Sequence, residues 1–115
     1  MNITNLTQHE INIFATDGAP VAAIAPSGLE ARIETKATLT HVVNGVEFYE
    51  TVVLGEPYCQ DKQGNRHPLP PMENGTIYIV SGIFRANFDR ADFWQPGQLK
   101  RNAQGQPIGC VGLSR

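Results

Sequence analysis

The residues best suited to bind a ligand lie close together in the segment SGIFRANFDRADFW, which runs from Ser81 to Trp94. Arg85 and Arg90 carry planar guanidinium groups, which can bind a phosphate through two parallel hydrogen bonds. Asp92 can accept hydrogen bonds from ribose or base donors, and the ring of Trp94 offers a face on which a base can stack. Together these side-chain types have the chemistry that a nucleotide-binding site needs.

The beginning of this segment joins two kinds of secondary structure. The preceding residues TIYIV are typical of a buried strand, whereas the residues from Ser81 to Phe88 are typical of a short helix that Ser81 caps. The free backbone N–H groups at the start of a helix attract phosphate, and Gly82 permits its close approach. The alternative is an ordinary capped helix with a solvated end, where arginines and aspartates pair locally. From the local sequence alone, the ordinary capped helix is the favoured interpretation.

Standard catalytic and cofactor-binding motifs are absent from the sequence. There is no G-x-S-x-G, H-E-x-x-H, Walker or G-x-G-x-x-G pattern. His9, His41 and His67 are far apart along the chain, so we expect no metal site and no cofactor. From its local sequence alone, His9 is interpreted as a surface or turn residue beside the first strand. These observations favour a binding protein over an enzyme.

The charge balance limits the classes of partner. Among 115 residues, nine are basic and eleven are acidic, which gives a formal net charge of -2. The chain therefore has no global attraction to nucleic acid or to an acidic membrane surface, and any anion site must be local. No segment resembles a signal peptide or reaches membrane-spanning length. We expect one cytoplasmic domain over residues 1–115, with Cys59 and Cys110 as reduced, buried thiols.

The pattern of turns predicts a mainly β fold. Asn44 and Gly45 tolerate the positive φ angles of a type I′ turn and are flanked by strand-forming residues, so they predict a hairpin. The spacing of the turn dipeptides suits an antiparallel meander. Five runs have strand character: Ile11–Ala15, Val21–Ala25, Leu29–Glu34, Thr38–Val43 and Val46–Leu54.

The second half of the chain completes this prediction. Thr76–Val80 shows no alternation of polar and apolar residues and is expected to be a central strand buried on both faces. Glu56–Asn74 holds four prolines and is expected to be a long surface loop. Two short strands should flank a turn at Gln104 and Gly105. The predicted fold class is mainly β (α+β), a compact antiparallel sheet or small barrel with one short helix packed on it.

Seven short motifs, in this order, resemble a family of small single-domain proteins of phages, prophages and some bacteria. They are NLTQH (5–9), PSG (26–28), ARI (31–33), GTIYIVS (75–81), RAD (90–92), PG (96–97) and KRNAQGQPIGCVGL (100–113). The motifs are weak individually but specific together, and they run from end to end of the chain. The chain departs from the family pattern at Gln8, where proline is usual, and its loop from Tyr58 to Met72 is longer.

The resemblance implies a phage anti-defence protein that acts in the cytoplasm of the bacterial host. Such proteins sequester the nucleotide signals of bacterial immunity, namely cyclic ADP-ribose isomers or cyclic dinucleotides. A deep binding pocket often lies between subunits, so we expect a homo-oligomer, at least a dimer. The candidate ligand-binding residues are Thr7, His9, Ser81, Arg85, Arg90, Asp92, Trp94 and Arg101.

Two alternatives belong to other classes of function. The first is a phosphodiesterase-like enzyme that cleaves such a signal, with His9 as general acid or base. The second is a structural phage component or a module that binds a host protein. That module would expose an apolar patch or a sheet edge and would need no small-molecule pocket.

Overall fold

The structure, a computed structural model, describes residues 1–115 and contains nine strands and one short helix. The mainly β fold with a single short helix is therefore confirmed. The elements are β1 (Asn2–Asn5), β2 (Ile11–Phe14), β3 (Pro20–Ile24), β4 (Glu30–Val43), β5 (Val46–Gln60), β6 (Arg66–His67), β7 (Thr76–Ile79), α1 (Gly82–Asn87), β8 (Phe93–Arg101) and β9 (Pro107–Ser114). No helix has the length and apolar character needed to cross a membrane.

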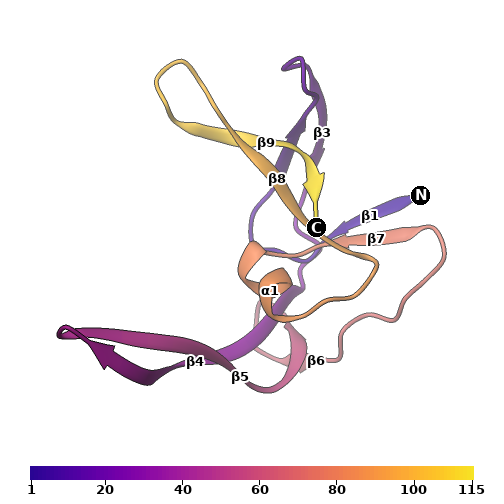
Figure 1. The fold of residues 1–115 in the computed structure, drawn as a ribbon. Helices are drawn as coiled ribbons and strands as arrows, with labels where there is room; N and C mark the ends of the chain where they lie inside the picture. The colour runs from indigo at the N-terminus through magenta and orange to yellow at the C-terminus, as the bar shows by residue number, and fades with distance from the viewer.

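Six strands form a sheet that is nearly closed into a barrel. The strand order is β1-β7-β8-β9-β2-β3, and its two outer strands approach each other where Asn5 pairs with Pro26, just after β3. The other three strands form a separate sheet in the order β4-β5-β6. Figure 1 shows β4 and β5 leaving the body of the protein as a long twisted ribbon.

The six-stranded sheet is mixed rather than purely antiparallel. The hairpins β2–β3 and β8–β9 are antiparallel, and the second of them confirms the turn predicted at Gln104 and Gly105. The pairs β1–β7, β7–β8 and β2–β9 are parallel. Turn dipeptides predict which neighbours in sequence form hairpins. They carry no information on parallel pairs, two of which join strands far apart along the chain.

The hairpin predicted at Asn44 and Gly45 is confirmed. Both residues have positive φ angles, 52° and 79°, as a type I′ turn requires. The strands on either side are much longer than predicted. The expected strands Leu29–Glu34 and Thr38–Val43 belong to one 14-residue strand, β4, and its partner β5 has 15 residues.

The predicted surface loop Glu56–Asn74 is partly wrong, because its first residues belong to β5. Gly55 takes a φ of 73° at an irregular point in the ladder, after which pairing with β4 resumes between Arg32 and Tyr58. The short strand β6 then pairs with the end of β5. A bulge at a glycine lets the strand continue past a point where regular pairing fails.

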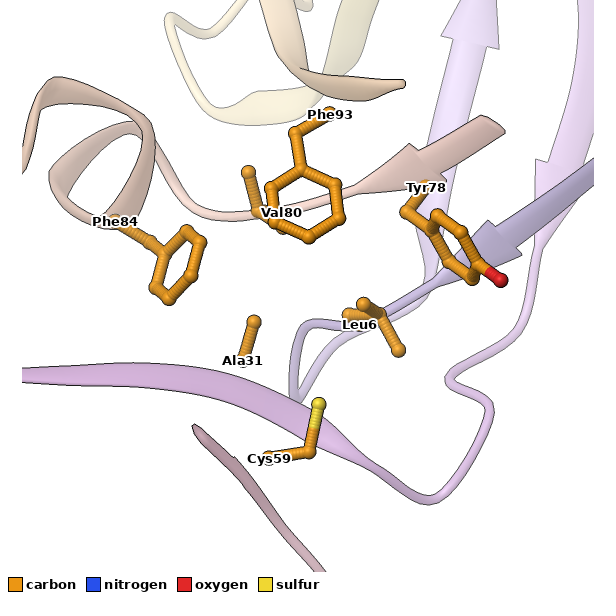
Figure 2. Packing of buried hydrophobic residues seen from close by; sticks show 7 residues of the cluster. All are labelled: Leu6, Ala31, Cys59, Tyr78, Val80, Phe84 and Phe93. Carbon is orange, nitrogen blue, oxygen red and sulfur yellow. The ribbon is translucent and has the colours of Figure 1, made fainter. Parts of the chain in front are cut away.

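The core lies below the end of β7, where the sheet, the helix and the base of the β4–β5 ribbon meet (Figure 2). Tyr78, Ile79 and Val80 are buried, so the central position predicted for this strand is confirmed, although its first residues are only half-buried. The ring centroids of Phe84 and Phe93 lie 5.7 Å apart in a tilted edge contact. The seven buried residues of this cluster are Leu6, Ala31, Cys59, Tyr78, Val80, Phe84 and Phe93.

The helix begins as predicted. Ser81 is its N-cap, and the Ser81 hydroxyl accepts a hydrogen bond of 3.1 Å from the backbone N–H of Phe84. With six residues, α1 is too short to be stable alone, so its stability comes from burying Phe84. Cys59 and Cys110 are free and buried, as predicted. Burial raises the pKa of the Cys59 thiol, although the nearby Arg90 opposes that shift.

Glycine at position 97 allows β8 and β9 to pack closely, and we predict that Gly97→Ala is strongly destabilising. A Cβ atom there would overlap the backbone carbonyl of Val111 and lie 2.8 Å from that of Gly112. We expect the free energy of unfolding to fall by about 3 kcal/mol, because the backbone of β9 must move. Urea unfolding followed by circular dichroism measures this change.

The matched control is Gly82→Ala, in the first turn of α1. A Cβ atom at residue 82 would meet only the side-chain oxygen of Gln95, at 3.3 Å. The higher helix propensity of alanine offsets that contact, so we expect a change below about 0.5 kcal/mol. An equal loss of unfolding free energy in the two variants would contradict the close approach of the paired strands β8 and β9 at Gly97.

Candidate functional site

The loop between β1 and β2 is held in place by the buried side chain of Asn5. The Asn5 amide nitrogen donates to the carbonyls of His9, at 2.8 Å, and Ile24, at 3.0 Å. Its side-chain oxygen accepts from the Thr7 backbone N–H, at 2.9 Å, and from the Thr7 hydroxyl, at 2.7 Å. Asn5 therefore fixes the position of Thr7 and His9, two of the predicted site residues.

Three hollows surround this loop. The smallest, of about 170 Å³, brings together Thr7, His9 and Ser81, with Glu30 on its wall. A second hollow of about 380 Å³ extends from Thr7 over the β4–β5 ribbon to Lys62, and a third of about 560 Å³ lies between His9 and the β8–β9 hairpin. The larger two fall within the range of small-molecule sites, which is about 300–1,000 Å³.

One wall of the hollow that extends to Lys62 is a turn that the Asp61 carboxylate holds in place through hydrogen bonds to the backbone. Asp61 Oδ1 accepts from the backbone N–H groups of Gln63 and Asn65, at 3.0 and 2.9 Å, and Oδ2 lies 2.8 Å from His67 Nε2. The bond with His67 is the largest cause that lowers the pKa of Asp61. The Asp61 carboxylate therefore acts as an acceptor that shapes this wall, and Lys62 beside it supplies a positive charge.

Arg90, which is partly exposed, forms an ion pair with the buried carboxylate of Asp92. Arg90 Nε and one terminal nitrogen donate to the two oxygens of Asp92, at 2.7 and 2.9 Å. The Arg90 guanidinium also lies 4.3 Å from the centroid of the Phe93 ring, and Asp92 is 7% exposed. Burial is the main cause that raises the pKa of the neighbouring Tyr78 hydroxyl. With both oxygens bound inside the protein, Asp92 has a structural role in this geometry.

The second pair of arginines converges on a single exposed carboxylate, in a group that we call the arginine cluster (Arg85, Asp89, Trp94 and Arg115). Asp89 Oδ1 lies 3.2 Å from Arg85 and 2.8 Å from Arg115. The Arg115 guanidinium is 5.6 Å from the centroid of the Trp94 ring. The Asp89 side chain is 66% exposed, and two guanidiniums against one carboxylate leave this surface positive.

Arg85 has one further feature in this cluster. Its Nε–H is buried and has no hydrogen-bond partner, whereas its terminal nitrogen binds Asp89. A buried donor without an acceptor is uncommon in folded proteins. The helix presents Arg85 one turn after Ser81, since the Arg85 backbone N–H donates to the Ser81 carbonyl at 3.0 Å.

The structure divides the predicted site residues into four places. Thr7, His9 and Ser81 line one hollow, and Arg85 and Trp94 belong to the arginine cluster. The other three residues lie elsewhere: Arg90 and Asp92 bind each other, and Arg101 donates to the Gly105 carbonyl in the β8–β9 turn at 2.7 Å.

Two important residues were absent from the sequence-based site. Asn5 is one of them, although the spacing Asn-x-Thr in NLTQH is a recognisable signal for an asparagine side chain that bonds the backbone two residues later. Arg115 is the other, and no local pattern marks it, because its partners Asp89 and Trp94 come from distant parts of the sequence. No three His, Cys, Asp or Glu side chains are grouped as a metal site would require.

The chain matches no family model, no curated protein and no solved structure at a significant level, so the resemblance seen in its motifs stays a prediction.

Asn5 is predicted to control the stability of this region. The variant Asn5→Ala removes a buried side chain that donates to the carbonyls of His9 and Ile24 and accepts from Thr7, so we expect a loss of about 2–4 kcal/mol in unfolding free energy. The control is Asn2→Ala in the same strand, where the exposed side chain makes no hydrogen bond and the change should be below about 0.5 kcal/mol. Thermal and urea unfolding measure both values, and similar values would exclude this role.

Arg90 and Arg85 are predicted to differ in their effect on stability. Arg90→Ala leaves the buried Asp92 carboxylate unpaired and should cost about 3–5 kcal/mol. Arg85→Ala breaks a pair with an exposed carboxylate and should cost at most about 1 kcal/mol. Chemical unfolding of both variants tests the difference. A stable Arg90→Ala variant would show that the Arg90–Asp92 pair does not hold the fold.

Proposed function

We propose that this protein binds and sequesters a nucleotide immune signal, such as a cyclic ADP-ribose isomer or a cyclic dinucleotide. The observation that carries the proposal is the convergence of Arg85 and Arg115 on the exposed Asp89. Two guanidiniums aimed at one point form the geometry that binds a phosphate. In the free protein, Asp89 occupies that point.

The proposal assigns the phosphates to the arginine cluster. A phosphate displaces the Asp89 carboxylate, which the solvent can accommodate because that side chain is mostly exposed. The same phosphate provides an acceptor for the unpaired Nε–H of Arg85. The gain in charge-assisted hydrogen bonds exceeds the loss of the two ion pairs of Asp89, since each such surface pair contributes at most about 1 kcal/mol.

The remaining parts of a nucleotide have nearby surfaces. The base is assigned to Trp94, which already carries the Arg115 guanidinium beside its ring. The ribose is not assigned to Asp92, because both Asp92 oxygens accept bonds from Arg90. Ser81, a predicted residue of the same site, lies one helical turn before Arg85.

Sequestration is favoured over cleavage by the surroundings of His9. The His9 ring has no hydrogen-bond partner in the chain, so no neighbouring group orients its tautomer as a general acid or base requires. The resemblance to phage and prophage proteins supports the choice of an immune signal over other nucleotides. It also supports action in the cytoplasm of the bacterial host.

A second candidate function is a module that binds another protein. The exposed apolar side chains of the β4–β5 ribbon favour it, since large exposed apolar patches mark interaction surfaces. The two candidates are compatible, because the arginine cluster lies on α1, β8 and the end of the chain rather than on the ribbon.

The proposed site predicts opposite effects for two neighbouring substitutions. Arg85→Ala should weaken binding about 10-fold to 100-fold, because charge-assisted bonds worth about 1.5–3 kcal/mol are lost. Asp89→Ala should strengthen binding several-fold, because the competing carboxylate is gone. Arg101→Ala, at the far end of β8, is the control and should leave affinity unchanged. Calorimetric titration with cyclic ADP-ribose isomers, cyclic dinucleotides and inorganic pyrophosphate measures these affinities.

The state of the recovered ligand separates sequestration from cleavage. We expect the nucleotide to be intact when it is released by heating the complex, and mass spectrometry identifies it. A linear product would instead establish the phosphodiesterase-like alternative. If Arg85→Ala and Asp89→Ala both bind as well as the unmodified chain, the arginine cluster is not the site.

A further inference from the structure

The part of the β4–β5 ribbon beyond its irregular point is an arm that the rest of the chain does not cover. We define the arm as residues 34–54, which pair from Glu34 and Leu54 to the turn at Asn44. Nine of the sixteen exposed large apolar side chains lie on it, although it is about a fifth of the chain. A two-stranded ribbon of this kind is marginally stable by itself in water.

The two faces of the arm differ in charge. Directly paired residues lie on the same face of a ribbon, and successive pairs alternate between faces. One face carries the charged residues Glu34, Lys36 and Glu50 together with five of the nine exposed apolar side chains, which are Val43, Val46, Phe48, Val52 and Leu54. The other, which we call the apolar face, consists of Thr35, Ala37, Leu39, Val42, Tyr49, Thr51 and Val53, with Glu47 as its charged residue near the tip.

The apolar face continues the core-facing side of β4 and β5. Ala31 and Cys59 pair with each other at the base of the ribbon and are buried in the core. Ile33, two residues further along, packs partly against that core. Thr35, Ala37 and Leu39 follow with the same alternation but have no cover. The side of the ribbon that is buried at its base is therefore exposed along the arm (Figure 1).

The total surface of the chain is larger than that of a compact monomer. A compact monomer of 12.6 kDa exposes about 6,200 Å², whereas this chain exposes 7574 Å². The excess of about 1,400 Å² exceeds the roughly 800 Å² that each partner buries in a standard stable interface. The radius of gyration, 16.6 Å, is likewise larger than the value of about 13 Å for a compact domain of this length.

We propose that the apolar face of the arm packs against the same face of a second copy of this chain, forming a two-fold symmetric dimer. Such a face suits itself as a partner, because it brings few like charges together when it meets its own copy. Outside the arm, Leu99 and Ile108 line the hollow between His9 and the β8–β9 hairpin, and the other exposed apolar residues, such as Val21, Met72 and Ile83, lie on separate elements. Contact between an arm and that surface would also leave the second arm free to bind a further copy. Two arms packed face to face close the assembly at two subunits.

Adjacent valines on β5 provide a matched test. Val53 lies on the apolar face and is 40% exposed, whereas Val52 lies on the charged face and is 43% exposed. We expect the unmodified chain to sediment as a dimer in analytical ultracentrifugation over a dilution series. Val53→Lys should raise the dimer dissociation constant about 100-fold, since it buries two unpaired ammonium groups per dimer. Val52→Lys should leave the dissociation constant unchanged.

Circular dichroism of both variants checks that they are folded, and unchanged spectra are expected because both valines are exposed. If the unmodified chain is monomeric at every concentration, the proposal is wrong and the arm is left to a foreign protein. Equal weakening by both lysines, or weakening by Val52→Lys alone, would also overturn it. Such results would indicate pairing through the strand edge or through the charged face. None of these outcomes depends on whether the protein binds a nucleotide.

Discussion

The fold depends on the hydrogen bonds of the buried Asn5, which lies where the six-stranded sheet nearly closes. The backbone of Asn5 pairs with Ile79 on one side and with the segment after β3 on the other. Its side chain uses both amide atoms to hold the β1–β2 loop and the end of β3. A buried amide is favourable only when its hydrogen bonds are satisfied, so this residue fixes the geometry around it. The strand β7 pairs with the strand that ends at Asn5, and α1 begins shortly after β7.

Burial separates residues that look equivalent in the sequence. Arg85 and Arg90 stand five positions apart beside aspartates, but Arg90 binds a nearly buried carboxylate and Arg85 binds an exposed one. In a low dielectric environment a bound pair is costly to break, whereas a pair in water exchanges readily with other ions. The same motif therefore contains one arginine paired with a buried carboxylate and one paired with an exposed carboxylate.

The body and the arm have different physical characters. The body buries a small core around Phe84 and Phe93, and its polar surface carries the arginine cluster. The arm presents apolar side chains to solvent on a ribbon that lacks a covering layer. Because the net charge is only -2, the surface is distinguished by local features such as these rather than by a global field.

The sequence by itself determined the local elements: the hairpin turn at Asn44, the cap at Ser81, the buried strand before it and the mainly β class. These follow from backbone preferences and from the alternation of neighbouring residues, which act over a few positions. Only the tertiary structure decided the parallel pairs, the reach of β5 beyond Leu54 and the partners of each arginine. Those features join residues that are distant along the chain, as Arg115 and Asp89 are, and their energies depend on burial that no local pattern encodes.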